Sequence, residues 1–457
     1  MTKRIRIIGG GLAGPEAALQ AAKRGCEVDL YEMRPTRSTE AHQTSDFAEL
    51  VCSNSLKSES EDTAPWLLKQ EMRRAGSFLL QAADASAVPA GHALAVDREV
   101  FSQRVAEMLA ASNVEIRREE ITHVPEDSED VITVLASGPL TSGALASELQ
   151  RLTGSEHLAF YDSISPIVEA SSIDMEKVYY AARWDKGTAD YINCPFTKEE
   201  YDAFIDALAT AEKIKQKAWE QLPADGNVTD AKVTTAQAGL KYFEGCLPIE
   251  ETARRGRDTL RFGPMKPAGL TNPKTGRWPY AAVQLRQENL RADSYNLVGF
   301  QNSLKYGEQA RVLRMIPGLE SAKFLRYGQI HRNTYIHAPS LLTETLQLRA
   351  HPNVMVAGQL SGVEGYTESI ASGLLAGRYA AALARGEQPK PAPRESANGS
   401  LSHYITHAEG KNFQPANITF DLLVPLEEEL RKKIRDKKER HRIQCERALV
   451  AWDAWLA

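Results

Sequence analysis

The first 32 residues alternate between short apolar runs and a helical pattern. Residues 5–8 are largely apolar and lead into a glycine-rich segment at 9–14. Small residues at helical spacing fill 15–23, and a second apolar run at 28–31 ends in Glu32. Apolar runs joined by a helical pattern are typical of buried parallel strands with a connecting helix. The pattern therefore predicts a strand–helix–strand unit at the start of the chain.

Three glycines lie between this strand and this helix. Gly9, Gly11 and Gly14 fill the pattern G-x-G-x-x-G. The first allows a tight turn, the second lets the backbone approach a pyrophosphate, and the third lets the helix pack on the strand. Glu32 follows Gly14 by 18 residues, where a carboxylate commonly accepts the ribose hydroxyls of a dinucleotide. The motif predicts a dinucleotide site, although the glycines alone also fit another kind of α/β turn.

Later apolar runs end in small residues in the same way. The run at 131–135 leads into Ala136-Ser137-Gly138, and the run at 354–357 leads into Gly358 and a glycine-rich loop. The carboxyl ends of parallel strands meet at one edge of a sheet, so we expect both loops at the same ligand. Helical spacing predicts further helices at 66–83, at 97–111 with Asp97 as N-cap, at 211–221, at 368–383 with Thr367 as N-cap, and from Pro425 onward.

The alternation of strand and helix patterns stops between about residues 160 and 326. Short runs are punctuated there by Pro and Gly, and aromatic and charged residues increase. This predicts a mixed α+β insertion in an otherwise α/β, Rossmann-like protein. We expect a discontinuous dinucleotide-binding domain with its first part at 1–158, the insertion at 159–326 on the substrate side, and its second part at 327–457 with a basic C-terminal helix.

Composition narrows the class of protein. Of the 457 residues, 42% are apolar, which suffices for two or three domains. No apolar run approaches the ~18 residues of a membrane span, and the chain starts in a strand rather than a secretory signal. Five cysteines without a C-x-x-C pair argue against disulfides and structural zinc. We therefore expect a cytoplasmic protein with no metal site and no membrane contact.

The net charge of −5 excludes a global basic field, so a nucleic-acid contact needs a local patch. The segment 254–280 interleaves basic and aromatic side chains, which suits phosphate and base contacts. The segment 431–442 is the densest basic stretch of the chain. Instead of binding RNA, the segment 254–280 could be a solvated surface loop, and the bases of 431–442 could compensate a helix dipole.

Two cysteines stand out by their neighbours. Cys52 lies near Lys57, and a nearby cation lowers the pKa of a thiol. Cys246 lies between Gly245 and Pro248, which suits a thiol at a loop tip. For Cys52, a structural role is an equal alternative on these residues alone.

Six motifs together resemble one family, the folate- and FAD-dependent tRNA (uracil-5-)-methyltransferases, relatives of the GidA-type tRNA-modifying flavoproteins. The cysteine and His-Arg-Asn-Thr motifs are specific to it, whereas the glycine fingerprint is not. The resemblance covers most of the chain and is thin at 210–235 and 386–400. The motifs are Gly9 to Gly14, Glu32-Met33-Arg34-Pro35, Leu50-Val51-Cys52-Ser53-Asn54-Ser55, Phe243-Glu244-Gly245-Cys246-Leu247-Pro248-Ile249-Glu250, His331-Arg332-Asn333-Thr334 and Gly362-Val363-Glu364-Gly365-Tyr366.

The resemblance implies a GidA-type FAD-binding domain and C5-methylation of the T-loop uridine of tRNA. The carbon donor is then 5,10-methylenetetrahydrofolate, reduced FAD carries the methylene and reduces it, and NADH or NADPH reduces FAD. Cys246 is implied as the nucleophile that adds to C6 of uracil and Cys52 as its partner in proton removal, and the reverse assignment also fits. Tyr366 is implied near the flavin, as ring packing or as a proton donor.

The resemblance also assigns binding residues. It implies that His331 stacks on the pterin, with His337 as the rival, and that Arg332 and Asn333 hold either the polar edge of the folate or the FAD. The same chemistry on ribosomal RNA, a flavin oxidoreductase acting on a small molecule, and a non-catalytic RNA-binding flavoprotein are the alternatives. The implied FAD contacts are Gly9, Gly10, Gly11, Leu12, Ala13, Gly14, Glu32, Arg34, Gly138, Gly358 and Gly365.

Overall fold

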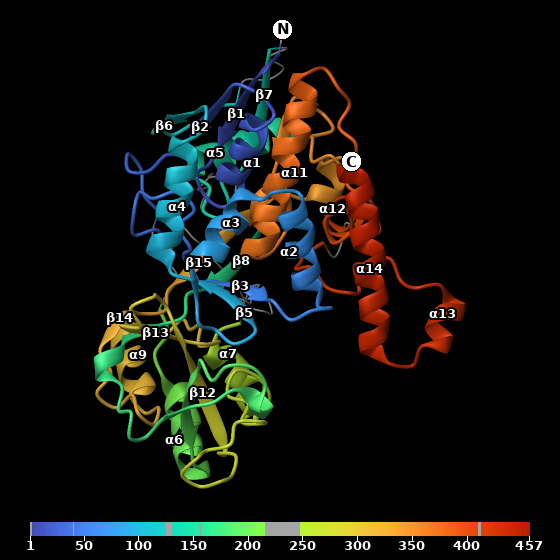
Figure 1. The fold of residues 1–457 in the computed structure, drawn as a ribbon. Coiled ribbons are helices and arrows are strands. Elements are labelled where there is room, and N and C mark those ends of the chain that lie inside the picture. Colours follow the sequence, from blue (N-terminus) through green and yellow to red (C-terminus); the bar gives the residue numbers. More distant parts are fainter. Residues whose placement is uncertain (1, 40, 125–129, 155–157, 215–246, 410–412) are drawn as a thin grey trace.

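The computed structural model describes residues 2–39, 41–124, 130–154, 158–214, 247–409 and 413–457 (Figure 1). Side chains are described for these residues except 158–163 and 330–332. The predicted catalytic Cys246 therefore lies outside the described residues.

A five-stranded parallel sheet forms the centre of the larger lobe. The strands lie in the order β16-β7-β1-β2-β6. This order carries the chain outward from β1 in both directions, as in a Rossmann-like fold. The strands are β1 (Arg4–Ile8), β2 (Val28–Tyr31), β6 (Val114–Arg117), β7 (Val131–Leu135) and β16 (Val354–Val356), so the strands predicted from the apolar runs are confirmed.

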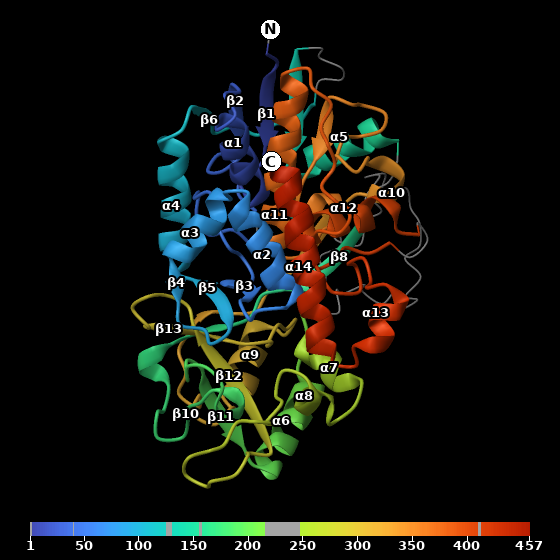
Figure 2. The same cartoon turned by 45° about the vertical axis from the view of Figure 1, so that its right-hand side comes forward.

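Two helices pack side by side on this sheet, α1 (Ala13–Ala22) and α11 (Tyr366–Ala384) (Figure 2). A Cβ on Gly373 would lie 2.4 Å from the carbonyl oxygen of Ala13, and one on Gly377 would lie 2.4 Å from that of Ala17. The two glycines let the backbones approach closely. The beginning of the chain is thereby joined to a helix more than 340 residues later.

The predicted helix at 66–83 is wrong as a single helix. The structure has α2 (Ala64–Arg74) and α3 (Phe78–Ala85) instead. Gly76 between them has φ +72°, a left-handed conformation that ends a helix, and the Ser77 hydroxyl caps α3 by accepting from Leu80 N–H. By contrast, α4 (Arg98–Ala110) begins as predicted, because Asp97 accepts from the N–H groups of Glu99 and Val100.

The predicted N-cap Thr367 is also wrong. Helix α11 already begins at Tyr366, with Gly365 at the cap position. The Thr367 hydroxyl donates to the carbonyl oxygen of Leu56, 3.0 Å away. A tertiary contact thus replaces the local cap.

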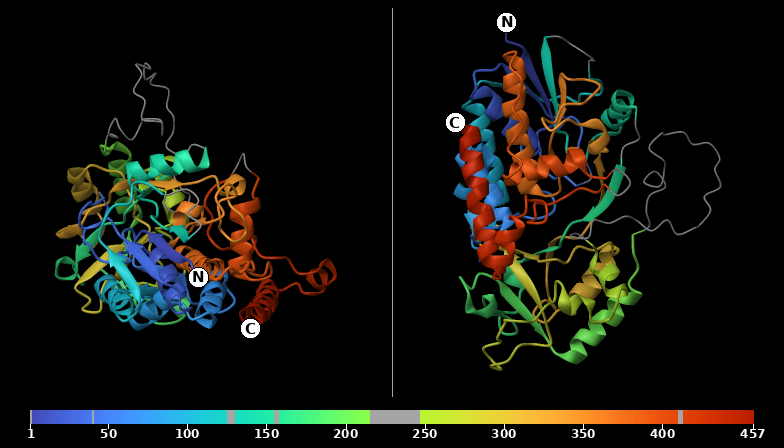
Figure 3. Two further views of the ribbon diagram at one scale, coloured as in Figure 1. Left: turned by 90° about the horizontal axis from the view of Figure 1, so that it is seen from above. Right: turned by 90° about the vertical axis from the view of Figure 1, so that its right-hand side faces the viewer.

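A six-stranded antiparallel sheet lies in the second lobe, in the order β10-β11-β12-β13-β9-β14 (Figure 3). Its buried side chains form a core separate from that of the parallel sheet. The antiparallel ribbon of β8 (Leu158–Ser163) and β15 (Ile330–Tyr335) joins the lobes. The second-lobe strands are β9 (Ile167–Glu169), β10 (Tyr179–Tyr180), β11 (Ile192–Phe196), β12 (Ala281–Gln287), β13 (Ser294–Leu297) and β14 (Phe324–Arg326).

Four helices accompany this sheet: α6 (Lys198–Thr210), α7 (Ile249–Arg254), α8 (Thr259–Phe262) and α9 (Tyr306–Leu313). The predicted helix at 211–221 is wrong in its described part, since Ala211 is extended and 212–214 are not helical. The Thr197–Glu200 capping box starts α6 upstream of that range.

The C-terminal tail forms two helices rather than the one predicted from Pro425. These are α13 (Glu428–Lys433) and α14 (Lys437–Leu456), and Asp436 caps the second. Helix α14 packs along α2, where the Trp452 indole N–H donates to the carbonyl oxygen of Glu71 at 2.7 Å (Figures 1 and 2). No helix in the described part of the chain combines the length and apolarity needed to cross a membrane.

The remaining elements are a small sheet and three helices of the described chain. A small antiparallel sheet contains β3 (Ser55–Ser58), β5 (Ala93–Val96) and β4 (Ala87–Val88). The three helices are α5 (Gly143–Thr153), α10 (Ala338–Leu341) and α12 (Ala397–His407).

Candidate active site

A cavity of about 280 Å³ opens at the carboxyl ends of β1, β2, β7 and β16. This edge of a parallel sheet is where nucleotide ligands bind in such folds. Every predicted cofactor residue except Gly14 lines the cavity, and so do Cys52, Tyr366 and Asn333. The fold therefore brings together residues that are more than 350 positions apart.

Gly14 lies behind the cavity wall, between helix and strand. A Cβ there would lie 1.8 Å from the carbonyl oxygen of Gly9, so only glycine permits this packing of α1 on β1. A Cβ on Gly11 would meet nothing within 4 Å, because this backbone faces open space. No side chain caps the N-terminus of α1, and its first N–H groups present a positive dipole end to that space.

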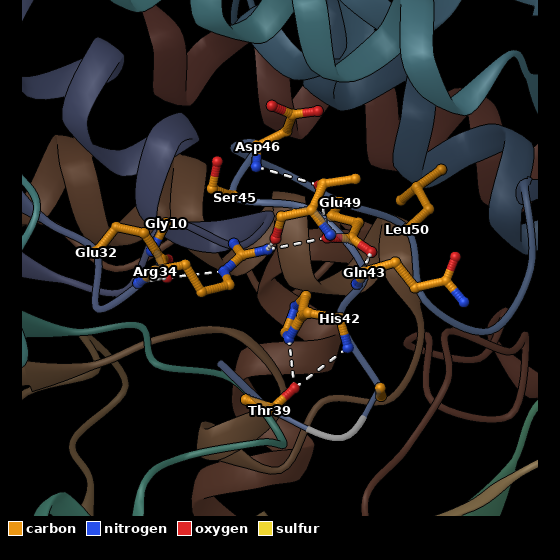
Figure 4. Close-up of polar contacts among 12 residues, drawn as sticks. Gly10, Glu32, Arg34, Thr39, His42, Gln43, Ser45, Asp46, Glu49 and Leu50 are labelled. Atoms are coloured by element: carbon orange, nitrogen blue, oxygen red, sulfur yellow. Dashed lines mark hydrogen bonds and ion pairs between the residues drawn. The ribbon is translucent and has the colours of Figure 1, made fainter. Parts of the chain in front are cut away.

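Glu32 is the centre of a buried polar network at this end of the cavity (Figure 4). Its Oε2 accepts from Gly10 N–H at 2.7 Å. Its Oε1 accepts from the backbone N–H of Arg34 at 2.9 Å and from the Arg34 Nε at 2.8 Å. Arg34 Nη1 in turn contacts Glu49 Oε2 at 3.1 Å. The guanidinium is thus clamped between two carboxylates.

This network sets the charge of Glu32. Burial raises the pKa of the carboxyl, but the hydrogen bond and charge of Arg34 outweigh burial and hold it below the usual range. Glu32 is therefore ionised at neutral pH. An ionised carboxylate at this position accepts hydroxyl groups, as ribose recognition requires.

Cys52 and Tyr366 meet at the other end of the cavity. The backbone N–H groups of Cys52 and Ser53 donate to the Tyr366 hydroxyl oxygen, at 2.7 and 3.2 Å. Burial raises the pKa of Tyr366 well above its usual value, and the neighbouring Cys52 raises it further. The hydroxyl therefore stays protonated while it fixes the backbone that carries the thiol.

Arginines surround the Cys52 segment. Arg98 Nη1 donates to the carbonyl oxygen of Leu50, and Arg286 Nη2 donates to Ser53 Oγ at 2.8 Å. Burial lowers the pKa of Arg98, but Glu288, Tyr366 and Cys52 together raise it above its ordinary value. The guanidinium stays charged, and a charged guanidinium near a thiol favours the thiolate.

The ammonium group of Lys57, which the sequence placed near Cys52, is paired with another group. Its Nζ lies 2.5 Å from Glu368 Oε1 and 2.7 Å from Asn417 Oδ1. In the sequence, Arg98 is only the residue after the predicted N-cap Asp97. Its hydrogen bond to Leu50, 48 positions earlier, cannot be predicted from the local sequence pattern.

Three buried polar atoms around the cavity have no hydrogen-bond partner in the described structure. They are Asn333 Oδ1, Glu368 Oε2 and Arg326 Nε. Asn333 lines the cavity, and Glu368 lies against Gly365 in its wall. Since unsatisfied buried polar atoms are costly, these atoms indicate places where a ligand completes the site.

Several predicted residues are only partly placed. His331 and Arg332 lie in β15 beside Asn333, and their side chains are outside the described part. The rival His337 does not line the cavity, and its Nδ1 lies 2.8 Å from Ser340 Oγ. After the undescribed Cys246, α7 begins at Ile249 directly behind Pro248.

Several basic residues of the two basic segments are paired within the chain. Arg257 contacts Asp202 and Asp206, and Arg261 lies 3.6 Å above the Tyr280 ring. In α14, Arg442 contacts Glu439 and Glu446. Arg254 keeps an 80% exposed side chain, although it too contacts Glu251. Internal pairing leaves less free positive charge than the sequence indicates.

The fold and the cavity define a Rossmann-like α/β protein of the FAD-binding type with an inserted domain. The chain matches the family described as glucose inhibited division protein A over residues 4–388. Two solved structures of Aquifex aeolicus GidA share this fold, each with a TM-score of 0.69 at 15% and 16% identity. They cover the whole chain and 74% and 76% of their own length.

Closer relatives define the particular family. The chain is 65% identical to a methylenetetrahydrofolate–tRNA-(uracil-5-)-methyltransferase of Koribacter versatilis, covering 100% of this chain and 99% of the relative. It is 58% identical to the protein of that name from Solibacter usitatus, with coverage of 100% and 99%. The chain belongs to this methyltransferase family.

Proposed function

We propose that this protein methylates C5 of the T-loop uridine of tRNA. The carbon donor is 5,10-methylenetetrahydrofolate, the cofactor is FAD, and NADH or NADPH is the reductant. One observation carries the proposal: identity of 65% over the full length to a relative whose name states methyl transfer to uracil C5 of tRNA with methylenetetrahydrofolate. The cavity supports it, because a dinucleotide cradle and a thiol share one space.

The residues of the cradle fit FAD. The open backbone at Gly11 and the N-terminus of α1 suit the pyrophosphate, and ionised Glu32 suits the ribose. Gly138, Gly358 and Gly365 also line the cavity, and we assign them to the flavin. When bound, FAD supplies the two electrons that convert a methylene unit into a methyl group.

The chain itself supplies nucleophilic and acid–base groups. A thiolate adds to C6 of uracil, which places electron density on C5. After C5 has bonded to the methylene carbon, a base removes the C5 proton. That carbon then leaves its donor nitrogen and takes up a hydride, and loss of the thiolate from C6 restores the C5–C6 double bond. We assign the addition to Cys246 and the proton removal to Cys52.

Cys52 is suited to proton transfer by its surroundings. Arg98 favours the thiolate, and Tyr366 holds the backbone of the thiol in place. Asn333 and its neighbours His331 and Arg332 in β15 are assigned to the folate. The unpartnered Asn333 Oδ1 supports this role, since a pterin offers N–H donors.

A reducing, cytoplasmic location is part of the proposal. Each described cysteine carries a thiol rather than a disulfide. Burial raises the pKa of Cys445 to about 12, so this core thiol is unreactive.

The decisive experiment uses the flavin-loaded protein with T-arm RNA that contains 5-fluorouracil. Fluorine replaces the proton that the base must remove, so the covalent adduct persists. Mass mapping should find the RNA on Cys246, and an adduct on Cys52 would reverse the assignment. Parallel assays offer labelled folate or S-adenosylmethionine with tRNA or ribosomal RNA. Transfer from S-adenosylmethionine, or to ribosomal RNA alone, would overturn the proposed function.

A further inference from the structure

A cluster of two histidines and one glutamate lies away from the cavity. His403 and His407 are one turn apart on α12, and Glu344 follows α10, which packs beside α12 (Figure 2). One ligand atom from each of the three residues lies within 4.8 Å of the others. None of the three lines the cavity or belongs to the proposed reaction.

The spacing of these atoms matches tetrahedral coordination. Nitrogen and oxygen ligands lie about 2.0–2.2 Å from a zinc ion, which separates two ligands of a tetrahedron by about 3.3–3.5 Å. Glu344 Oε1 lies 3.2 Å from His403 Nδ1 and 3.7 Å from His407 Nδ1. The imidazole rings are parallel, with centroids 4.2 Å apart. The two oxygen-to-nitrogen distances thus bracket the separation expected for two ligands of one ion.

Rigid elements hold the three residues. Glu344 sits in a turn closed by a hydrogen bond from Leu346 N–H to the Thr343 carbonyl oxygen, at 2.9 Å. The flanking Leu342 and Leu346 are completely buried. Helix α12 is fixed at its start by the Ser396 cap and by Glu71, which accepts from the N–H groups of Ala397 and Asn398. The backbone positions are therefore set before any ion arrives.

Solvent reaches the cluster. The side chains of His403, His407 and Glu344 are 38%, 47% and 42% exposed. A hydrated ion can therefore enter, and a water molecule can complete the coordination. His403 Nδ1 lies 3.2 Å from Glu344 Oε1, and His407 Nδ1 lies 3.0 Å from Thr406 Oγ1.

We propose that Glu344, His403 and His407 bind a divalent transition-metal ion of the zinc class. Two imidazole nitrogens and one carboxylate oxygen suit zinc, cobalt and nickel and do not suit magnesium or calcium, which prefer oxygen ligands. The ion links α12 to the turn after α10. This proposal departs from the expectation, drawn from the sequence, of a protein without a metal site.

The test is a cobalt titration of the flavin-loaded full-length protein, followed through the cobalt d–d bands at wavelengths beyond the flavin absorption. We expect one ion per chain. Substitutions Glu344→Gln, His403→Ala and His407→Ala should each weaken binding at least tenfold, since even outer-shell changes commonly cost about 10–100-fold. Zinc should raise the melting temperature of the unsubstituted protein but not of His403→Ala.

His123→Ala is the matched control. His123 pairs with Glu148 at 2.8 Å, and within the described residues no third ligand joins this pair. Its substitution should leave cobalt binding unchanged. The proposal is overturned if no ion binds, if binding survives both histidine substitutions, or if a sulfur-to-cobalt charge-transfer band shows that cysteines hold the ion. Unchanged flavin absorbance and unchanged metal-free melting temperature verify that the variants fold.

Discussion

The two ends of the cavity differ in how their polar groups are satisfied. At the Glu32 end, the carboxylate accepts three hydrogen bonds from this chain, and Arg34 bridges to Glu49. Near the Cys52 end, Asn333 Oδ1, Arg326 Nε and Glu368 Oε2 have no partner in the described structure. One end is complete without a ligand, whereas the other is not.

This difference suggests that the Glu32 end binds the cofactor and that the Cys52 end carries out the reaction. A network that is already satisfied keeps its geometry, so the Glu32 end presents a fixed surface to the nucleotide. Unsatisfied atoms gain partners when a ligand arrives, so the Cys52 end gains most from binding substrate. Substitutions at the Glu32 end should therefore reduce cofactor binding and stability, and substitutions at the Cys52 end should reduce turnover.

The largest expected effect belongs to Cys52. Cys52→Ala should lower methyl transfer by about 1000-fold while FAD stays bound, since positioned proton transfer contributes about 10²–10⁴-fold. Single-turnover transfer of label from folate to tRNA measures the loss. Cys26→Ala, which removes a buried thiol outside the cavity, is the control and should keep full activity. If the Cys52→Ala variant transferred the methyl group at the normal rate, the Cys52 end would not be the catalytic end of the cavity.

Glu32→Ala, unlike Cys52→Ala, should lower stability and FAD binding. It removes one of the two carboxylates that pair with buried Arg34, and breaking a buried ion pair costs about 3–5 kcal/mol. We expect a lower melting temperature and loss of FAD on gel filtration. Arg37→Ala breaks an exposed pair with Glu120 and should cost less than about 1 kcal/mol. Equal effects of the two substitutions would contradict a special role for the buried network.

Tyr366→Phe should have a smaller and purely kinetic effect. It leaves the N–H groups of Cys52 and Ser53 without their acceptor, at a cost of about 1–3 kcal/mol. We expect methyl transfer to fall about tenfold or more, with FAD affinity unchanged. Loss of FAD binding instead would show that Tyr366 serves cofactor binding, as the Glu32 end does.

The smallest effect is a pH dependence at Glu32. Arg34 lowers the folded-state pKa of this carboxyl below its ordinary value of 4.5. The resulting stabilisation is complete above the ordinary pKa and is lost as the pH falls through the folded-state pKa. The stability difference between the unsubstituted protein and Glu32→Gln should therefore be largest at neutral pH and shrink in acid. Urea unfolding across pH measures it, and a difference that grows in acid would contradict the sign.

Much of the fold was predictable because local rules determine it. The apolar runs predict the parallel strands, and the glycine spacing predicts the turn between β1 and α1. Predictions failed where a local rule met a competing contact. Gly76 interrupts a continuous apolar pattern, and Thr367 bonds Leu56 instead of capping its own helix.

The candidate site was predictable only in part. The cysteine and glycine motifs identified Cys52, Gly138, Gly358 and Tyr366, and the fold places all four at one cavity. The arginines near Cys52 were missed because helix α4 and strand β12 approach that segment only in the folded chain. The His403–His407–Glu344 cluster was missed for the same reason, since 59 residues separate Glu344 from His403.

The sequence by itself determined the dinucleotide fingerprint, the strand–helix order and the membership in a methyltransferase family. Those features follow from residue type and spacing, which act over a few positions of the chain. The tertiary structure alone decided which charges approach Cys52, which buried atoms lack partners and which residues form the His403–His407–Glu344 cluster. Such contacts depend on the packing of distant segments, and no spacing along the chain encodes their distances.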